Sequence, residues 1–256
     1  METHFVEAGD PGGMPVVFIH GFPFSHAMWQ AQLSALGSGR RLVAYDVRGH
    51  GDTPPGDGLY TIDLFVDDLL ALLDHLDIKS AILCGLSMGG YIALRAANRA
   101  PARVRGLILA DTRAEADANQ GKFARVAAAK TIADRGMDAF AFEFAHNLFS
   151  PKSAGKACVG DIHRLMAATD PLGARGALLA LAARPDATPW LPLIKVPTLV
   201  VVGEDDALTP PALSQTLAAS IPGARLAVIA AAGHLSPAEN PEEFNRLAEE
   251  FLSDLR

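Results

Sequence analysis

The chain has 256 residues, of which 50% are hydrophobic and 20% charged, the composition of an ordinary globular protein with a substantial core. Its formal net charge is −7 and it has no Lys/Arg cluster, which argues against a nucleic-acid partner. No apolar run approaches the roughly 18 residues of a membrane span, and the first residues lack the apolar core of a signal peptide. The two cysteines have no metal-type spacing. These features predict a cytoplasmic protein without a membrane partner.

Short apolar runs alternate with helical patterns along most of the chain. Strands of a parallel sheet are covered on both faces and therefore read as nearly continuous apolar runs. Six such runs are predicted strands: residues 15–20, 41–46, 81–85, 105–111, 197–203 and 224–230. Apolar stripes at helical spacing predict helices at residues 61–77, 87–100 and 241–255, the first with Thr61 as N-cap. The alternation predicts an α/β fold with a mostly parallel central sheet and helices on both faces.

One segment breaks this alternation. Residues 113–194 contain no strand-like run, only Ala-rich helical stretches with scattered Phe and Met, separated by Pro- and Gly-containing reversals. We predict a helical cap here, inserted before the last two strands and packed over one edge of the sheet. Residues 1–112 and 195–256 then form the core domain. Most aromatic side chains of the cap are expected in its own interior, and the sequence does not indicate which cap residues line a pocket.

The stretch CGLSMGG, residues 84–90, lies where a predicted strand gives way to a predicted helix. Residues 85–89 fit the pattern G-x-S-x-G, which in this context is typical of a nucleophile elbow. The glycines permit a tight, strained turn, and the hydroxyl of Ser87 then projects from the end of the sheet. The alternative is a tight strand-to-helix turn without chemistry. We predict that Ser87 is a nucleophile.

A serine nucleophile needs a base, and eight histidines are candidates. His234 follows the last predicted strand and precedes the last helix, so it lies at the same edge of the sheet as Ser87. His20 directly precedes Gly21, and His50 lies in a glycine-containing loop, so both are better suited to shaping loops. The other five lie on surfaces, helices or the cap. We predict His234 as the base.

The base needs an acid that orients it, and four carboxylates follow predicted strands. Glu204, Asp205 and Asp206 come directly after the fifth predicted strand, in a loop that can reach His234. Asp111 ends the strand before it and is a rival. Three of these four are expected to cap helices or to carry loop charge.

Acyl-transfer chemistry also needs an oxyanion hole with two backbone N–H donors. One donor is expected from Met88, the residue after the nucleophile. The other is expected from Phe22, in the loop after the first predicted strand, where Gly21 lets the backbone approach. Five groups are thus predicted to meet at one edge of the sheet.

Taken together, these segments resemble the α/β-hydrolase family over nearly the whole chain. They are HGFPFSHAMW, YDVRGHGDT, GLSMGG, VGEDDALTP and AGHLSPAENPEEF, in the family's order. The resemblance implies a Ser-Asp-His triad without a metal or an organic cofactor. The family's acid loop has an aspartate three positions after glycine and then Thr-Pro, which matches Gly203 and Asp206 and favours Asp206 over Asp205. Some relatives carry the acid on the earlier strand, so Asp111 stays open.

Within the family, the resemblance is closest to small carboxylesterases, enol-lactonases and cofactor-free haloperoxidases or perhydrolases. Trp29 matches a tryptophan near the oxyanion loop, where packing is its expected role. The predicted activity is hydrolysis of a small carboxylic ester or lactone through an acyl-enzyme. A small-molecule receptor with slow hydrolysis and a peroxide-using enzyme are the alternatives. Arginines of the cap are candidates to bind a substrate carboxylate, although each is individually expected to be a solvated charge: Arg113, Arg125, Arg164 and Arg175.

Overall fold

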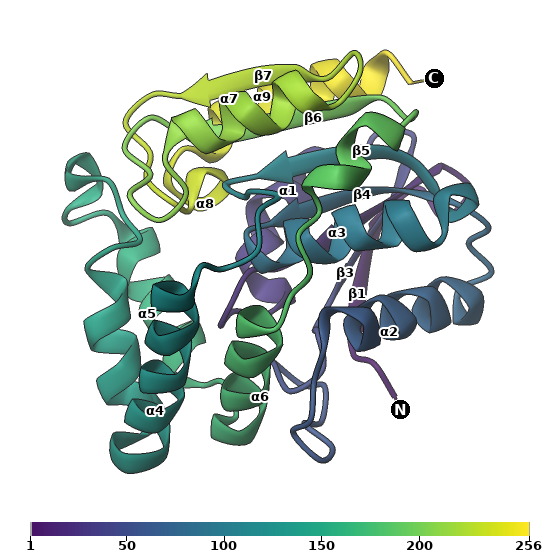
Figure 1. Ribbon diagram of the computed structural model, residues 1–256. Coiled ribbons are helices and arrows are strands. Elements are labelled where there is room, and N and C mark those ends of the chain that lie inside the picture. Colours follow the sequence, from purple (N-terminus) through teal and green to yellow (C-terminus); the bar gives the residue numbers. More distant parts are fainter. Residues whose placement is uncertain (1, 256) are drawn as a thin grey trace.

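The computed structural model describes residues 2–255, and its centre is a seven-stranded sheet in the order β1-β3-β2-β4-β5-β6-β7 (Figure 1). The strands are β1 Phe5–Gly9, β2 Met14–Ile19, β3 Arg40–Tyr45, β4 Ala81–Leu86, β5 Val104–Ala110, β6 Thr198–Gly203 and β7 Arg225–Ile229. Among the strands of residues 2–255, only β1 runs antiparallel, beside β3. The six predicted strands and the mostly parallel sheet are confirmed. The sequence analysis missed β1, a five-residue edge strand that is partly exposed along its length.

Helices cover both faces of the sheet, as predicted. One face carries α2 Ile62–His75, α3 Met88–Arg99 and α7 Pro211–Ser220, and the other carries α1 Gln30–Ala35, α8 Ser236–Glu239 and α9 Pro241–Ser253. Alternate strand residues therefore enter different cores: Val17 and Ile19 pack with the first group, and Val16 and Phe18 with the second. Thr61 caps α2 as expected, since its hydroxyl accepts the N–H of Leu64 at 3.0 Å. The short helices α1, α7 and α8 were not predicted.

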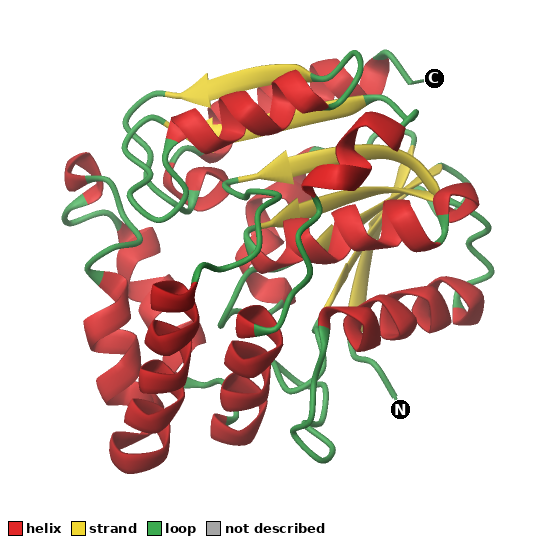
Figure 2. Ribbon diagram, viewed as in Figure 1, coloured by secondary structure: helices red, strands yellow, loops and turns green. Residues whose placement is uncertain are grey.

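Three helices that follow β5 and precede β6 in the chain form a separate layer beside the sheet (Figure 2): α4 Asn119–Ala145, α5 Ala157–Ala167 and α6 Pro171–Ala182. In this picture the strand arrows point toward these helices, so the layer lies on the side of the sheet where the strands end. Helix α4 is broken at Gly136, whose φ of 81° is outside the helical range. Residues 113–194 contain no strand, as expected. The division into a core and a cap domain stays a prediction.

Short 3₁₀ helices connect these elements: His26–Trp29, Pro101–Arg103, Pro151–Ser153 and Thr188–Leu193. Trp29 is fully buried and its ring lies 5.2 Å from that of Phe18 and 6.2 Å from that of Phe244, measured between centroids. Its role is therefore packing between β2 and α9, as expected. Within residues 2–255, no helix is both long and apolar enough to cross a bilayer.

Candidate active site

Ser87 occupies the turn that joins β4 to α3. Its φ of 50° and ψ of −109° lie in a region that non-glycine residues rarely adopt, which costs on the order of 1–3 kcal/mol. The flanking glycines make the turn possible. A Cβ on Gly85 would lie 2.3 Å from the carbonyl oxygen of Gly89, and one on Gly89 would lie 2.1 Å from that of Ile19. The turn is fixed by a hydrogen bond from the N–H of Ser87 to Ala110.

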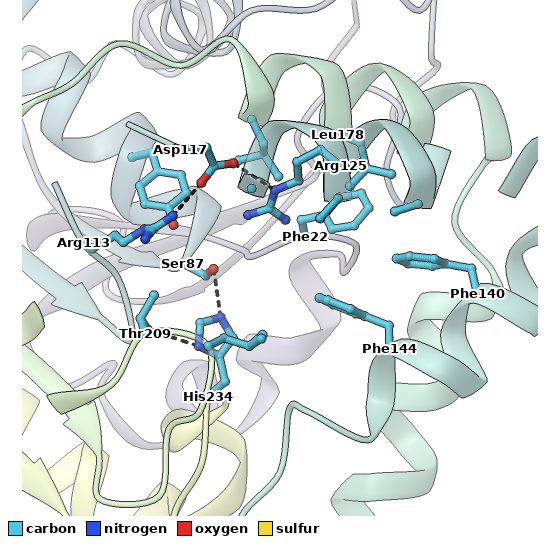
Figure 3. A pocket seen from close by; sticks show the side chains of 16 residues that line it. Phe22, Ser87, Arg113, Asp117, Arg125, Phe140, Phe144, Leu178, Thr209 and His234 are labelled. Atoms are coloured by element: carbon cyan, nitrogen blue, oxygen red, sulfur yellow. Dashed lines mark hydrogen bonds and ion pairs between the residues drawn. The ribbon is translucent and has the colours of Figure 1, made fainter. Parts of the chain in front are cut away.

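His234 lies in the loop between β7 and α8 and faces Ser87 (Figure 3). Its Nε2 is 2.9 Å from the Ser87 hydroxyl, and its Nδ1 is 2.9 Å from Oδ2 of Asp206. The N–H of His234 donates to the carbonyl oxygen of Leu148 at 2.7 Å, which anchors the loop against the cap. His234 and Asp206 are both buried. The structure thus brings together the three residues that the sequence analysis selected.

Asp206 is held in the turn after β6. Its carboxylate accepts the N–H groups of Leu208 and Thr209 at 2.9 Å each and the Thr209 hydroxyl at 2.6 Å. Burial opposes ionisation, but the hydrogen bonds from His234 and Thr209 outweigh it and lower the pKa of Asp206. Thr209 had entered the sequence analysis only as part of a motif, yet its hydroxyl also lies 3.3 Å from Nδ1 of His234. Asp206 is therefore an ionised, immobilised partner for the imidazole.

The rival carboxylates have other partners. Asp111 is fully buried and accepts hydrogen bonds from the N–H of Gly203 and from the N–H and hydroxyl of Ser236. Burial and the nearby charge of Asp206 raise the pKa of Asp111 well above its usual value. It joins β6 to α8 and makes no hydrogen bond to His234 among the described residues. Asp205 instead accepts the Ser150 hydroxyl at 2.6 Å.

The two predicted oxyanion donors are the N–H groups of Met88, which follows Ser87 in the chain, and of Phe22. Met88 is the first residue of α3, so its N–H has no partner within the helix, and the positive end of the helix dipole lies there. Phe22 lines the same cavity as Ser87. Within residues 2–255, neither N–H donates to a backbone or side-chain acceptor. The oxyanion role of these two groups stays a prediction.

His20 shapes the loop that carries Phe22, as predicted. Its Nε2 accepts the N–H of Val47 at 2.9 Å, so its Nδ1 carries the proton and donates to the carbonyl oxygen of Gly21 at 2.8 Å. Complete burial lowers the pKa of His20 to about 4. His50, whose ring centroid lies 5.1 Å away, is buried as well, and burial lowers its pKa to about 3. Both histidines are neutral parts of the scaffold.

The neutral state of His20 predicts a stability that depends on pH. Between about pH 4 and 6.5 the unfolded chain binds a proton that the folded chain does not, so acidification through this window destabilises the fold. His20 alone should contribute a loss of about 2 kcal/mol in unfolding free energy from about pH 7 to 5. In urea titrations at both pH values, His20→Asn should lose correspondingly less than the wild type. Equal losses in the two proteins would contradict a neutral His20.

One group outside the site has the spacing of metal ligands. Among the described residues, donor atoms of His4, His26 and Asp46 lie within 4.8 Å of one another. However, each Asp46 oxygen already accepts a histidine Nδ1 at 2.9 Å and a backbone N–H, from His26 or Asp52. None of these residues lines the cavity with Ser87. The contacts fit a loop-fixing role.

A cavity of about 320 Å³ lies between the sheet and the cap, with Ser87 and His234 in its wall. Figure 3 shows Phe140 and Phe144 together on one side of the cavity and the charged residues Arg113, Asp117 and Arg125 on another. The lining comprises Phe22, Ser87, Tyr91, Arg113, Asp117, Gly121, Ala124, Arg125, Ala128, Phe140, Phe144, Leu178, Leu181, Leu208, Thr209 and His234. Of the four cap arginines considered above, Arg113 and Arg125 line the cavity, while Arg164 and Arg175 do not. Which arginines reach the cavity depends on how the cap helices pack, and the sequence pattern does not specify that packing.

The sheet, its covering helices and the turn at Ser87 between β4 and α3 define an α/β fold of the hydrolase type. Residues 14–241 match the family model for the alpha/beta hydrolase fold, and the chain belongs to that family. It is 32% identical over 239 residues to 3-oxoadipate enol-lactonase 2 of Acinetobacter baylyi. The aligned residues cover 93% of this chain and 88% of that relative.

Two further proteins show the range of the similarity. The non-heme chloroperoxidase CPO-A1 of Kitasatospora aureofaciens is 34% identical over 266 residues, with 94% of this chain and 93% of the relative covered. Among solved structures, a thermophilic esterase from Thermogutta terrifontis with bound malate superposes with a TM-score of 0.95 at 36% identity. That comparison covers 99% of this chain and 93% of the esterase. The shared fold and the predicted family are confirmed.

Proposed function

We propose that this protein is a serine hydrolase that cleaves a small carboxylic ester or lactone. The observation that carries the proposal is the continuous chain of contacts from the Ser87 hydroxyl through His234 to Asp206, with 2.9 Å at each step. Such a chain lets an imidazole take the serine proton while a carboxylate fixes the tautomer and stabilises the imidazolium. The names of the enol-lactonase and esterase relatives support the same reaction class.

In the proposed mechanism, Ser87 Oγ attacks the carbonyl carbon while its proton passes to Nε2 of His234. The oxyanion of the tetrahedral intermediate accepts the N–H groups of Phe22 and Met88. His234 then donates the proton to the departing alcohol oxygen, which leaves an acyl ester on Ser87. Water repeats these steps, with His234 as base, and releases the acid. Asp206 keeps the proton of the neutral imidazole on Nδ1, so that Nε2 is free to accept.

An organophosphonate probe tests the nucleophile directly. The phosphonate should form a covalent adduct on Ser87 with loss of activity, because only a hydroxyl with an adjacent base and an oxyanion site attacks it rapidly. Peptide mass spectrometry after labelling locates the adduct. Labelling at another residue, or none on active protein, would refute the assignment. A receptor with slow hydrolysis would instead show a single slow turnover of p-nitrophenyl esters and a shift in melting temperature.

Perhydrolysis is a second candidate, and the similarity to a non-heme chloroperoxidase favours it. In this reaction hydrogen peroxide replaces water as the attacker of the acyl-enzyme, and the products are a peracid and regenerated Ser87. All earlier steps are the same, so the site geometry fits both. Parallel assays of acid and peracid formation, with the peroxide concentration varied, separate the two activities.

A further inference from the structure

Three arginines surround one carboxylate at the wall of the cavity. Asp117 Oδ1 lies 2.5 Å from Arg113 and 2.9 Å from Arg184, and its Oδ2 lies 3.3 Å from Arg125. Although burial opposes ionisation, the guanidiniums of Arg184 and Arg125 outweigh it and lower the pKa of Asp117. The carboxylate is therefore ionised, and the group of four side chains has an excess of positive charge.

Arg184, which does not line the cavity, needs the Asp117 carboxylate as its counter-ion. Arg184 is 2% exposed in its side chain, and its guanidinium also donates to the carbonyl oxygens of Leu181 and Glu115 and stacks 4.3 Å above the ring of Tyr91. A charge this deeply buried requires a counter-ion. Asp117 therefore shares one negative charge among three guanidiniums, and an excess of positive charge remains at Arg113 and Arg125 in the cavity wall.

These two arginines also keep unused donors. Arg125 makes one side-chain hydrogen bond, from Nε to Asp117 at 3.3 Å, and its terminal nitrogens have no acceptor within residues 2–255. The Nε of Arg113 is buried and likewise lacks an acceptor there. Both side chains are one quarter exposed and both line the cavity that holds Ser87. Figure 3 shows them flanking Asp117 across the cavity from Phe140 and Phe144.

We infer that Arg113 and Arg125 bind a free carboxylate on the acyl part of the substrate, so that the enzyme acts on short esters or lactones of this anionic class. Planar guanidiniums pair well with carboxylates, and desolvation inside a pocket strengthens the pairing. A cavity of about 320 Å³ is at the lower end for small-molecule sites, which fits a short acyl chain between Ser87 and the arginines. This inference rests on the proposed function, whose nucleophile attacks the other end of the same substrate.

The first test compares p-nitrophenyl hydrogen glutarate with the neutral p-nitrophenyl valerate. Wild-type kcat/KM should favour the charged ester, and Arg125→Gln should lower the ratio by about 10- to 100-fold, mainly through KM, since one charge-assisted pair is lost. Arg164→Gln is the matched control, because Arg164 is 75% exposed, pairs with Asp161 and is not among the cavity-lining residues. A wild-type preference for the neutral ester, or equal effects of the two substitutions, would overturn the inference.

The second test separates binding from chemistry. Calorimetry with glutarate on Ser87→Ala measures the anion site in a protein that cannot form an acyl-enzyme. Glutarate should bind, and adding Arg125→Gln or Arg113→Gln should weaken it at least about tenfold, so either substitution serves if the other unfolds the chain. Absent binding, or binding indifferent to both arginines, would refute the anion site. Glutarate binding without phosphonate labelling of Ser87 would instead refute the proposed hydrolysis alone.

Discussion

Replacing Ser87 with alanine should lower kcat for ester hydrolysis by about 10⁶-fold, as in other enzymes that lose a serine nucleophile. The loss is this large because His234 and Asp206 act only through the Ser87 oxygen, 2.9 Å from Nε2 of His234. The residual rate comes from the oxyanion donors and from substrate binding. Turnover of p-nitrophenyl esters, with active-site titration of the wild type, measures the effect.

The variant should remain folded. The alanine side chain is smaller than that of serine, and the backbone N–H at position 87 keeps its hydrogen bond to the carbonyl oxygen of Ala110. Equal melting temperatures for wild type and Ser87→Ala would attribute the loss to chemistry. If the alanine variant retained activity within tenfold of the wild type, the nucleophile would have to lie elsewhere.

The second large effect is expected at the acid. Asp206→Asn should lower kcat by about 10⁴-fold, because an amide facing Nδ1 favours the wrong imidazole tautomer and does not stabilise the imidazolium. Geometry should change little, since an asparagine oxygen can still accept the N–H groups of Leu208 and Thr209. Turnover and melting temperature should be measured together.

Asp111→Asn is the matched control for this prediction. Asp111 bonds to Gly203 and Ser236 rather than to His234, so its substitution should reduce stability while turnover per folded molecule falls less than tenfold. A larger loss of turnover in Asp111→Asn than in Asp206→Asn would make Asp111 the acid and reject the assignment made from the geometry.

The strands that the sequence predicts well are those whose two faces are both buried. In β4 and β6 every residue is buried, so the apolar run and the strand coincide. Strand β1 was missed because an edge strand of five partly exposed residues has no such run. The helices α1, α7 and α8 have 6, 10 and 4 residues, too few turns for a clear apolar stripe.

In the candidate site, too, some features could be predicted from the sequence and others could not. The turn around Ser87 was predictable because glycines and the strand-to-helix change are local features. The contacts of the cap were not. No sequence feature distinguishes Arg184 from other arginines, yet it is buried beside Asp117 and shares that carboxylate with Arg113 and Arg125 of the cavity wall. The sequence around Arg125 and around Arg164 does not indicate that the first lines the cavity and the second is exposed.

By itself, the sequence determined the order of the main strands and helices, the family and the residues most suited to act as nucleophile and base. Only the tertiary structure showed that Asp206, and not Asp111, contacts His234, and which cap arginines reach the cavity. The physical reason is the range of the interactions. Strand, helix and turn preferences depend on near neighbours, whereas the contact between Ser87 and His234 spans 147 positions and exists only after the sheet and its loops have packed.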